Sequence, residues 1–253
     1  MTMSEWAWLE GRISVEAAIS GQNRSIDAVY IRRGKWDRYT KRLLQTAEKA
    51  GIRVEIVDEA FIVEHAAGKS HGGLLARAGP RRFVSLEALL EGSGNPLVVM
   101  LDGIEDPFNF GQAVRALYAA GISGLVVRPR NWLTATAVVA RSSAGATELM
   151  PTAVAESALE AAAFFRERGL MVACTAKEKA LSLYEADLSR PLFLLIGGEK
   201  RGITRSFLDQ ADIRLSIPYG RSFKYSLGAA ASTAVFAFEL SRQRRGADSP
   251  NPA

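Results

Sequence analysis

Short, continuous apolar runs alternate with helical patterns from residue 97 to residue 242. A strand that is apolar at successive positions is typical of a parallel sheet, because both faces of such a sheet are covered by helices. The alternation therefore predicts an α/β fold with a parallel sheet and helices on both faces. The expected strands cover residues 97–101, 125–127, 170–174, 192–196 and 214–217, and the expected helices cover residues 111–120, 136–141, 155–168 and 228–242.

A smaller α/β unit is expected ahead of this domain. Its expected helices cover residues 14–19, 36–50 and 61–65, and its expected strands cover residues 26–31, 53–57 and 74–76. Turn and linker residues gather in 79–82 and 91–96, which places the boundary there. We therefore predict a small domain in residues 1–80, a linker in 81–96, a larger domain in 97–243 and a disordered polar tail in 244–253.

Composition excludes several classes of protein. The chain has 253 residues, of which 48% are hydrophobic, enough for a core without disulfides or metals. Its single cysteine, Cys174, cannot form an intrachain disulfide, and its two histidines belong to no cluster with zinc-ligand spacing. The sequence has neither a secretion signal nor an apolar run long enough to span a membrane. We therefore expect a cytoplasmic protein that binds no metal and does not enter a membrane.

Basic residues cluster early in the chain, although the net charge is only +5. Trp36 and Tyr39 lie among them, and interleaved cations and aromatic rings are typical of surfaces that bind phosphates and stack on bases. A solvated helix face is an equally good interpretation of the same pattern. The basic residues concerned are Arg32, Arg33, Lys35, Arg38, Lys41 and Arg42.

Asn109 and Arg115 follow the first strand of the larger domain and accompany a helix. Asn109 could simply be the N-cap of that helix. Arg115 lies in an otherwise apolar stretch, where an unpaired buried guanidinium would be costly, so its charge must reach water, an acid or a phosphate. The helix begins at the carboxyl edge of a parallel sheet, where ligands bind, and a functional site is therefore the favoured interpretation.

Gly197 and Gly198 follow another expected buried strand. Without Cβ atoms, their backbone lets a flat ligand approach closely. The segment does not have the spacing of a dinucleotide-binding or phosphate-binding glycine loop, which disfavours a nucleotide-dependent oxidoreductase. The next residue, Glu199, could belong to the same site or could only pair with Arg201 or Arg205.

Ile217 and Pro218 end the last expected strand, and a polar loop leads from them to a helix of small residues. Such a helix could pack closely against another helix or a partner subunit. Ser226 could cap it. Arg221 and Lys224 could contact phosphate or could be ordinary loop residues.

Three separated segments resemble the signatures of the SpoU/TrmH family of knotted RNA 2′-O-ribose methyltransferases. Residues 142–146, with Glu148 and Pro151, are similar to a further family segment. Residues 11–78, including the sequence Ser-His-Gly-Gly at 70–73, resemble the L30e-type substrate-binding domain of several members. The three signature segments are Asp106-Pro107-Phe108-Asn109-Phe110-Gly111 leading to Arg115, Leu195-Ile196-Gly197-Gly198-Glu199 leading to Gly202, and Ile217-Pro218-Tyr219-Gly220 leading to Ser226-Leu227.

The resemblance implies a SPOUT fold, in which the larger domain contains a deep trefoil knot and forms a homodimer. It further implies methyl transfer from S-adenosylmethionine to structured RNA, with ribosomal RNA favoured over transfer RNA. Arg115, Asn109, Glu199 and Ser226 would fall on the family's catalytic positions. Arg115 would position the ribose hydroxyl or accept its proton, Asn109 would orient the guanidinium, and Glu199 would support the first signature. From the charge pattern, we expect RNA to contact Arg32, Arg33, Lys35, Arg38, Arg221 and Lys224. The cofactor would lie against Thr175, Ala176, Gly197, Gly198, Glu199, Ile217, Pro218, Ser226 and Leu227.

One position departs from the family pattern. Gly228 stands where the third signature usually has asparagine, so a side-chain hydrogen bond is missing or comes from elsewhere. Losing one such bond costs about 1–3 kcal/mol, or roughly ten- to a hundredfold in rate, which leaves activity the favoured expectation. The alternative is an RNA-binding relative that transfers methyl groups weakly or not at all.

Overall fold

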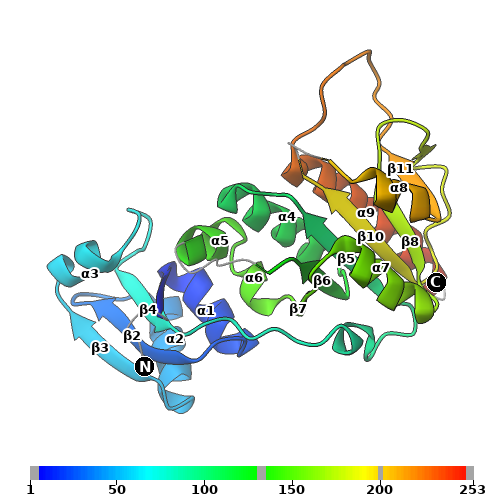
Figure 1. Ribbon diagram of the computed structural model, residues 1–253. Helices are drawn as coiled ribbons and strands as arrows, with labels where there is room; N and C mark the ends of the chain where they lie inside the picture. The colour runs from blue at the N-terminus through cyan, green and yellow to red at the C-terminus, as the bar shows by residue number, and fades with distance from the viewer. Residues whose placement is uncertain (1–5, 130–134, 199–201, 249–253) are drawn as a thin grey trace, which may run out of the picture. The chain divides into compact units, whose positions relative to one another are not determined.

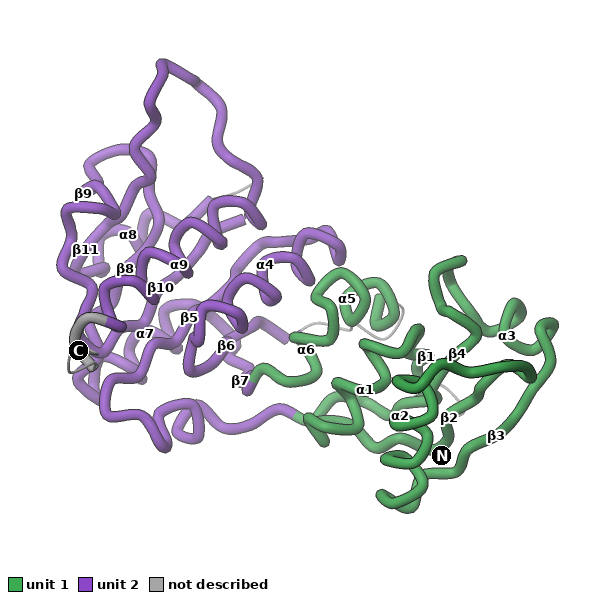
Figure 2. The backbone as a smooth tube through the Cα atoms, turned by 180° about the vertical axis from the view of Figure 1, so that it is seen from behind, with its two compact units in different colours: residues 1–82, 131–150 green, residues 83–130, 151–253 purple. Residues whose placement is uncertain are grey.

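The computed structural model describes residues 6–129, 135–198 and 202–248 (Figure 1). The chain divides into two compact units, shown in different colours in Figure 2. The N-terminal unit consists of Met1–Arg82 and Asn131–Met150. The C-terminal unit consists of Phe83–Arg130 and Pro151–Ala253.

A seven-stranded sheet forms the centre of the described part of the C-terminal unit, in the order β7-β6-β5-β10-β8-β11-β9. All neighbouring strands pair in parallel, which confirms the parallel sheet that the apolar runs predicted. All five predicted strands are present, whereas β7 and β9, of three and two residues, were not predicted. The strands are β5 Leu97–Asp102, β6 Gly124–Val127, β7 Thr152–Val154, β8 Met171–Thr175, β9 Leu181–Ser182, β10 Leu192–Gly197 and β11 Ile213–Ser216.

Helices cover both faces of this sheet (Figure 1). On one face, α7 (Ala158–Glu167) and α8 (Arg205–Gln210) share a core with alternate residues of the central strands, in which Phe165 stacks on Phe193 with ring centroids 5.0 Å apart. On the other face, α4 (Pro107–Ala119) packs against α9 (Ala229–Asp248). The short 3₁₀ helix η1 (Glu87–Leu90) lies in the predicted linker and contributes Leu89 to the first of these cores.

The last helix is longer than predicted. It was expected to end at residue 242, yet α9 continues to Asp248, so the predicted disordered tail begins with helical residues. Arg244 explains part of this extension, because its guanidinium donates a 2.8 Å hydrogen bond to the carbonyl of Asn95 and another to that of Arg190. Residues 249–253, the remainder of the predicted tail, lie outside the described residues.

A second, mixed sheet of order β1-β4-β2-β3 forms the N-terminal unit. β1 and β2 pair antiparallel with β4, and β2 pairs in parallel with β3. Helices α1, α2 and α5 share one core with the sheet, and α3 packs in a second core with Tyr30. The short β1 was not predicted. The bounds are β1 Ala7–Glu10, α1 Gly11–Gly21, β2 Ile26–Arg32, α2 Arg38–Lys49, β3 Arg53–Val57, α3 Glu59–His65 and β4 Leu74–Ala78.

A segment predicted in the larger domain packs in the N-terminal unit. Helix α5 (Thr136–Ser142) contacts β1, and α6 (Ala146–Leu149) contacts α1. Glu148 is 1% exposed and forms an ion pair of 2.7 Å with the buried guanidinium of Arg24. Arg81 donates a 2.8 Å hydrogen bond to the carbonyl of Met150. The compact units therefore differ from the predicted domains in residues 131–150, while a boundary within residues 81–96 stays a prediction.

Candidate functional site

Several of the predicted cofactor-binding residues lie at one edge of the parallel sheet. Strands β5, β10, β8 and β11 are consecutive neighbours, so their carboxyl ends meet at the same edge, where α/β sheets bind ligands. Gly197 at the end of β10 pairs with Asp102 of β5, and Thr175 at the end of β8 pairs with Leu215 of β11. Ile217 and Pro218 directly follow β11. The structure therefore brings Thr175, Gly197 and Ile217 to one strand edge.

The floor of this edge is built from backbone. A Cβ atom on Gly198 would lie 1.9 Å from the carbonyl oxygen of Gly103, and one on Gly197 would lie 2.7 Å from Cγ1 of Ile203. Neither position can carry a side chain without displacing its neighbour. Gly103, which has a φ of +85°, was not predicted as a site residue; only the glycine itself, just after β5, could have indicated it.

Two hydrogen bonds hold the strand ends together. The Thr175 hydroxyl accepts a long, 3.4 Å bond from the N–H of Gly197, and the Ala176 N–H donates a 2.8 Å bond to the carbonyl of Leu215. These contacts join β8 to both of its neighbours beyond the regular ladder. The predicted contacts of Thr175 and Ala176 with a cofactor remain a prediction, although their place at the strand edge is compatible with it.

The loop from residue 217 to residue 228 projects from the carboxyl edge (Figure 1). The Tyr219 hydroxyl accepts a 2.9 Å hydrogen bond from the N–H of Leu227, which brings the end of the loop back to its beginning. Phe223 lies between Tyr219 and Tyr225, with ring centroids 6.3 and 5.5 Å away, and all three rings are exposed. Tyr219 belongs to the third signature segment but was not predicted as a site residue. Nothing in the sequence shows which group its hydroxyl contacts.

Gly228, rather than Ser226, takes the N-cap position of α9. The carbonyl of Gly228 accepts a 3.0 Å bond from the N–H of Ser232, which is the first bond of the helix. The interpretation of Ser226 as the N-cap is therefore wrong. Ser226 is exposed and lies in the loop before the helix. The small residues that follow it pack α9 against α4, as one of the interpretations of that pattern expected.

Asp106, rather than Asn109, caps α4. Its carboxylate accepts a 2.7 Å hydrogen bond from the N–H of Asn109, and Pro107 occupies the first helical position, where a missing N–H costs nothing. This pair explains why the helix begins at Pro107, four residues before the predicted start. Because Asp106 performs the capping, the half-buried side chain of Asn109 is left for another role at the carboxyl edge.

Arg115 is exposed on α4. Within the described part of the chain, its guanidinium makes no hydrogen bond or ion pair. It follows Asn109 by six residues, which places the two about 120° apart around the helix and about 9 Å apart along it. The described residues show no hydrogen bond between Asn109 and Arg115, and the expected orienting role of Asn109 stays a prediction. The charge of Arg115 is in water and is accessible to a phosphate.

Cys174, next to Thr175 in β8, is fully buried. Burial raises the pKa of its thiol to about 11, while the charge of Arg214 opposes that rise. The thiol is therefore neutral near pH 7, and a neutral buried thiol is a poor nucleophile.

Glu199 was expected at this edge and lies outside the described residues.

The predicted RNA-binding residues belong to both units. Arg32, Arg33, Lys35 and Arg38 are exposed in the N-terminal unit. The guanidinium of Arg38 lies 4.6 Å from the ring centroid of Tyr39, and Arg32 forms an ion pair with Glu59. In the C-terminal unit, Arg221 and Lys224 are exposed on the projecting loop, and Lys224 Nζ lies 5.1 Å from the ring centroid of Tyr225.

The described residues contain neither a candidate metal centre nor a helix able to cross a membrane. Residues 6–129, 135–198 and 202–248 contain no group of three or more histidine, cysteine, aspartate or glutamate side chains that could hold a metal ion. In the same ranges, no helix combines the length and the apolar character needed to cross a membrane.

Two family models match the chain. The model described as the SpoU rRNA Methylase family matches residues 96–238, and the model described as RNA 2'-O ribose methyltransferase substrate binding matches residues 8–84. The first match contains the three signature segments and the second contains most of the N-terminal sheet.

Similar curated proteins match over almost their whole length. A protein of Ralstonia nicotianae named 23S rRNA (guanosine-2'-O-)-methyltransferase RlmB is 32% identical over 244 residues, which are 96% of this chain and 98% of that protein. Proteins of the same name from Pseudomonas aeruginosa and Shewanella oneidensis are 32% and 30% identical, over 96% and 92% of this chain and 98% and 95% of theirs.

Solved structures show the same fold. The SpoU methyltransferase AviRb from Streptomyces viridochromogenes, crystallised with the cofactor AdoMet, superposes with a TM-score of 0.79 at 20% identity, covering 96% of this chain and 92% of that one. An AdoMet-bound rRNA methyltransferase from Sinorhizobium meliloti gives 0.77 at 21% identity, covering 94% and 87%.

Proposed function

The chain belongs to the SpoU rRNA methylase family, and on that premise we propose that it methylates ribose 2′-hydroxyls of ribosomal RNA with S-adenosylmethionine. Relatives named as 23S rRNA guanosine-2′-O-methyltransferases support the substrate class, since they match both units. The observation that carries the proposal is the strand edge itself, where Gly197, Gly198 and Gly103 leave backbone without side chains at the carboxyl ends of adjacent parallel strands.

The residues at this edge fit a flat adenosine and its attached chain. Backbone groups of Gly197, Gly198, Ile217, Pro218 and Leu227 would hold the cofactor, with Thr175, Ala176, Glu199 and Ser226 beside it. The place of Gly197 and Gly198 at the carboxyl end of β10 supports this assignment, while their Cβ positions are filled by Ile203 and Gly103 of the same chain. When bound, S-adenosylmethionine supplies an activated methyl group on a sulfonium centre.

The chain's own residues would position the ribose. A ribose hydroxyl is a poor nucleophile near pH 7, so orientation contributes much of the acceleration. The exposed guanidinium of Arg115 is suited to hold a phosphate beside the target ribose. Asn109, at the first turn of α4, would contact the ribose, and Glu199 would support the first signature.

The test is transfer of labelled methyl groups from S-adenosylmethionine to unmodified 23S rRNA. We expect Arg115→Ala to reduce transfer by about 10²- to 10³-fold, because a positioning contact is lost. Arg190→Ala is the matched control, since Arg190 is also exposed but precedes the amino end of β10, at the opposite edge of the sheet. Transfer by Arg115→Ala at the rate of the control would contradict the proposed role.

A second candidate function rests on Gly228. A glycine at the N-cap of α9 offers no side chain to the site, which favours an RNA-binding relative with weak transfer. Gly228→Asn separates the two functions. An increase of roughly tenfold or more in transfer would show that the missing side chain limits the rate. An active wild-type protein that this substitution leaves unchanged would exclude the alternative.

We extend the proposal to assembly and location: a homodimer formed through the C-terminal unit, a trefoil knot in that unit, and action in the cytoplasm, where ribosomal RNA is found. Exposed aromatic side chains on the packed helix pair support the dimer, since Phe108 and Tyr118 lie on α4 and Phe238 lies on α9. Light scattering of the purified chain measures its mass directly. A monomer at micromolar concentration would contradict the dimer.

A further inference from the structure

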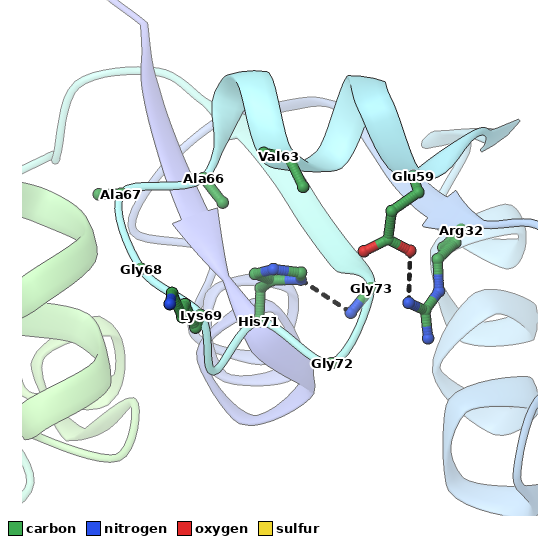
Figure 3. Close-up of a pocket in the computed structure, with 10 residues that line it drawn as sticks. All are labelled: Arg32, Glu59, Val63, Ala66, Ala67, Gly68, Lys69, His71, Gly72 and Gly73. Atoms are coloured by element: carbon green, nitrogen blue, oxygen red, sulfur yellow. Dashed lines mark hydrogen bonds and ion pairs between the residues drawn. The ribbon is translucent and has the colours of Figure 1, made fainter.

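A pocket of about 600 Å³ opens in the N-terminal unit, within residues 32–73 (Figure 3). It lies between the start of α3 and the loop from residue 66 to residue 73. Arg32 and Lys69 supply two cations to its lining, Val63 supplies an apolar wall, and His71 and Gly73 form its inner end. The volume is within the range of small-molecule sites.

His71 presents a defined hydrogen-bond donor to this pocket. Its side chain points into the pocket (Figure 3), and the residue is only 9% exposed. Nδ1 accepts a 3.0 Å hydrogen bond from the N–H of Gly73. A ring nitrogen that accepts carries no proton, so the ring hydrogen is on Nε2. Within the described residues, Nε2–H has no hydrogen-bond acceptor, and it is available to a ligand.

The wall beside Lys69 is held in place by buried charge. The side chain of Glu10 is completely buried and accepts a hydrogen bond from the N–H of Ala67. Its other oxygen lies 2.7 Å from Nη1 of Arg141. A Cβ on Gly68 would lie 2.5 Å from the same Nη1, so the loop packs directly on that guanidinium. The pocket is therefore preformed and does not depend on a ligand to shape it.

On the opposite wall of the pocket, the backbone also packs closely against a charged side chain. A Cβ atom on Gly73 would lie 3.0 Å from Cβ and 3.1 Å from Nε of Arg32, so the backbone of Gly73 packs against that side chain. The guanidinium of Arg32 also pairs with Glu59, which fixes its position at the pocket. Glu59 forms an ion pair with only one of the two cations that line the pocket. Lys69, the other cation, can therefore bind an anion.

We propose that this pocket binds one unpaired nucleotide of the RNA substrate. The phosphate would lie against Lys69 and Arg32, and the base would lie against Val63 with an acceptor atom on His71 Nε2–H. Cations, an apolar wall and one oriented donor match the chemistry of a nucleotide, and RNA readers bind unstacked bases in this manner. This inference deepens the proposed function and rests on it for the identity of the ligand as RNA.

The test uses the full chain labelled with ¹⁵N at histidine, which gives two imidazoles to observe. The probes are the four nucleoside 5′-monophosphates, ribose 5-phosphate and inorganic phosphate. We expect a nucleotide to shift the Nε2 signal of His71 in a saturable manner and to leave His65 unchanged, because His65 stacks on Phe61 and does not line the pocket. Equal shifts with inorganic phosphate would show that the pocket binds anions and does not recognise a nucleotide. The absence of a shift with every nucleotide would contradict the proposal.

Two substitutions test the assignment. His71→Gln removes the imidazole, and its folding is checked by thermal unfolding. Arg32→Ala changes only an exposed residue, and we expect it to weaken nucleotide binding at least fivefold. Arg53→Ala is the matched control, because Arg53 is also exposed and ion-paired but does not line the pocket. Equal affinities for Arg32→Ala and Arg53→Ala would contradict the site.

The methyl-transfer assay separates this inference from the proposed function. His71→Gln should raise the KM for RNA with little change in kcat, since the pocket belongs to the N-terminal unit and the proposed cofactor site to the C-terminal unit. Nucleotide binding without any methyl transfer by the wild-type chain would defeat the proposed function and leave the pocket. Normal transfer without nucleotide binding would defeat only the pocket.

Discussion

The two units hold their parts together by different means. In the N-terminal unit, buried ion pairs join elements that are far apart in sequence, as Arg24 joins Glu148 and Glu10 joins Arg141. In the C-terminal unit, the candidate site is formed by glycine backbone in close contact, as at Gly103 and Gly198. Buried ion pairs fix loops in the N-terminal unit, and close backbone packing at glycines fixes them in the C-terminal unit. We therefore expect substitutions in the two units to affect different measurements.

The buried charges should be costly to disturb. Arg24 is 9% exposed and Glu148 1%, and the half-buried Arg81 interacts with the same carboxylate. Desolvation lowers the pKa of Arg81 to about 10, and Glu148 opposes this shift. One carboxylate therefore compensates one buried and one half-buried guanidinium group. Removal of one partner from a buried pair leaves uncompensated charge, whereas exposed pairs contribute little.

The largest effect on stability is expected for Glu148→Gln. It should lower the free energy of unfolding by about 3–5 kcal/mol, because Arg24 and Arg81 lose their buried counter-charge. Denaturant unfolding of the full chain measures this quantity. Glu16→Gln in the same unit is the matched control, since Glu16 is exposed and pairs with Arg12 one helical turn away. It should change stability by less than about 0.5 kcal/mol.

The same experiment tests whether substitutions in the two units affect different measurements. If Glu148→Gln and Glu16→Gln were equally stable, the buried charges would not hold residues 131–150 in the N-terminal unit. If Glu148→Gln also abolished binding of S-adenosylmethionine at temperatures where it is folded, the two units would not be affected separately. Calorimetric titration of the folded variant distinguishes these outcomes.

Gly198→Ala should act on binding instead. Its added methyl would lie 1.9 Å from the carbonyl oxygen of Gly103, so the backbone of the strand edge must shift. We expect affinity for S-adenosylmethionine to fall by about a hundredfold, which is near 2.7 kcal/mol. Titration calorimetry gives the affinity, and Gly94→Ala is the control because a Cβ there would meet no atom within 4 Å. Unchanged affinity in Gly198→Ala would mean that the glycine floor does not contact the cofactor.

The smallest effect concerns Cys174, a neutral group buried at the same strand edge. Its pKa is about 11 in the folded chain against an ordinary value of 9.0, so the unfolded chain loses the thiol proton first as pH rises. Stability from this group is complete below pH 9 and is lost progressively between about pH 9 and 11. By pH 10 the loss should be about 1 kcal/mol, at roughly 1.4 kcal/mol per pKa unit.

Unfolding free energies of the wild type and Cys174→Ala, measured from pH 8 to pH 10, test this expectation. The alanine variant is less stable at every pH because of the cavity, so the informative quantity is the change with pH. We expect that change to be smaller in the variant by about 1 kcal/mol. Parallel curves would show that the thiol is not desolvated in the folded chain.

Local pattern was sufficient for five strands of the parallel sheet and for the edge on which the site lies, whereas the short strands β1, β7 and β9 were not predicted. The five apolar runs became β5, β6, β8, β10 and β11, because continuous burial on both faces has a direct signature in sequence. The residues just after those strands, including Gly197 and Ile217, then had to share an edge. The assignment of roles to Arg115 and Asn109 came from the family resemblance, and the structure leaves those roles as proposals.

The capping residues show the limit of local pattern. Asn109 and Ser226 were both suitable N-caps by residue type, yet Asp106 and Gly228 occupy those positions. A shift of a few residues along the helix decides which side chain caps and which faces the site. Packing fixes that shift, because the buried face of α4 must meet α9.

By itself the sequence determined an α/β protein with a parallel sheet, a smaller α/β domain before it and a glycine-lined strand edge. Only the tertiary structure decided that residues 135–149 pack in the N-terminal unit, that Gly103 meets Gly198, and that His71 points into a pocket. Periodicity records whether a residue is buried. It does not record which distant segment buries it, because that depends on the shapes and charges of surfaces that exist only after the chain has folded.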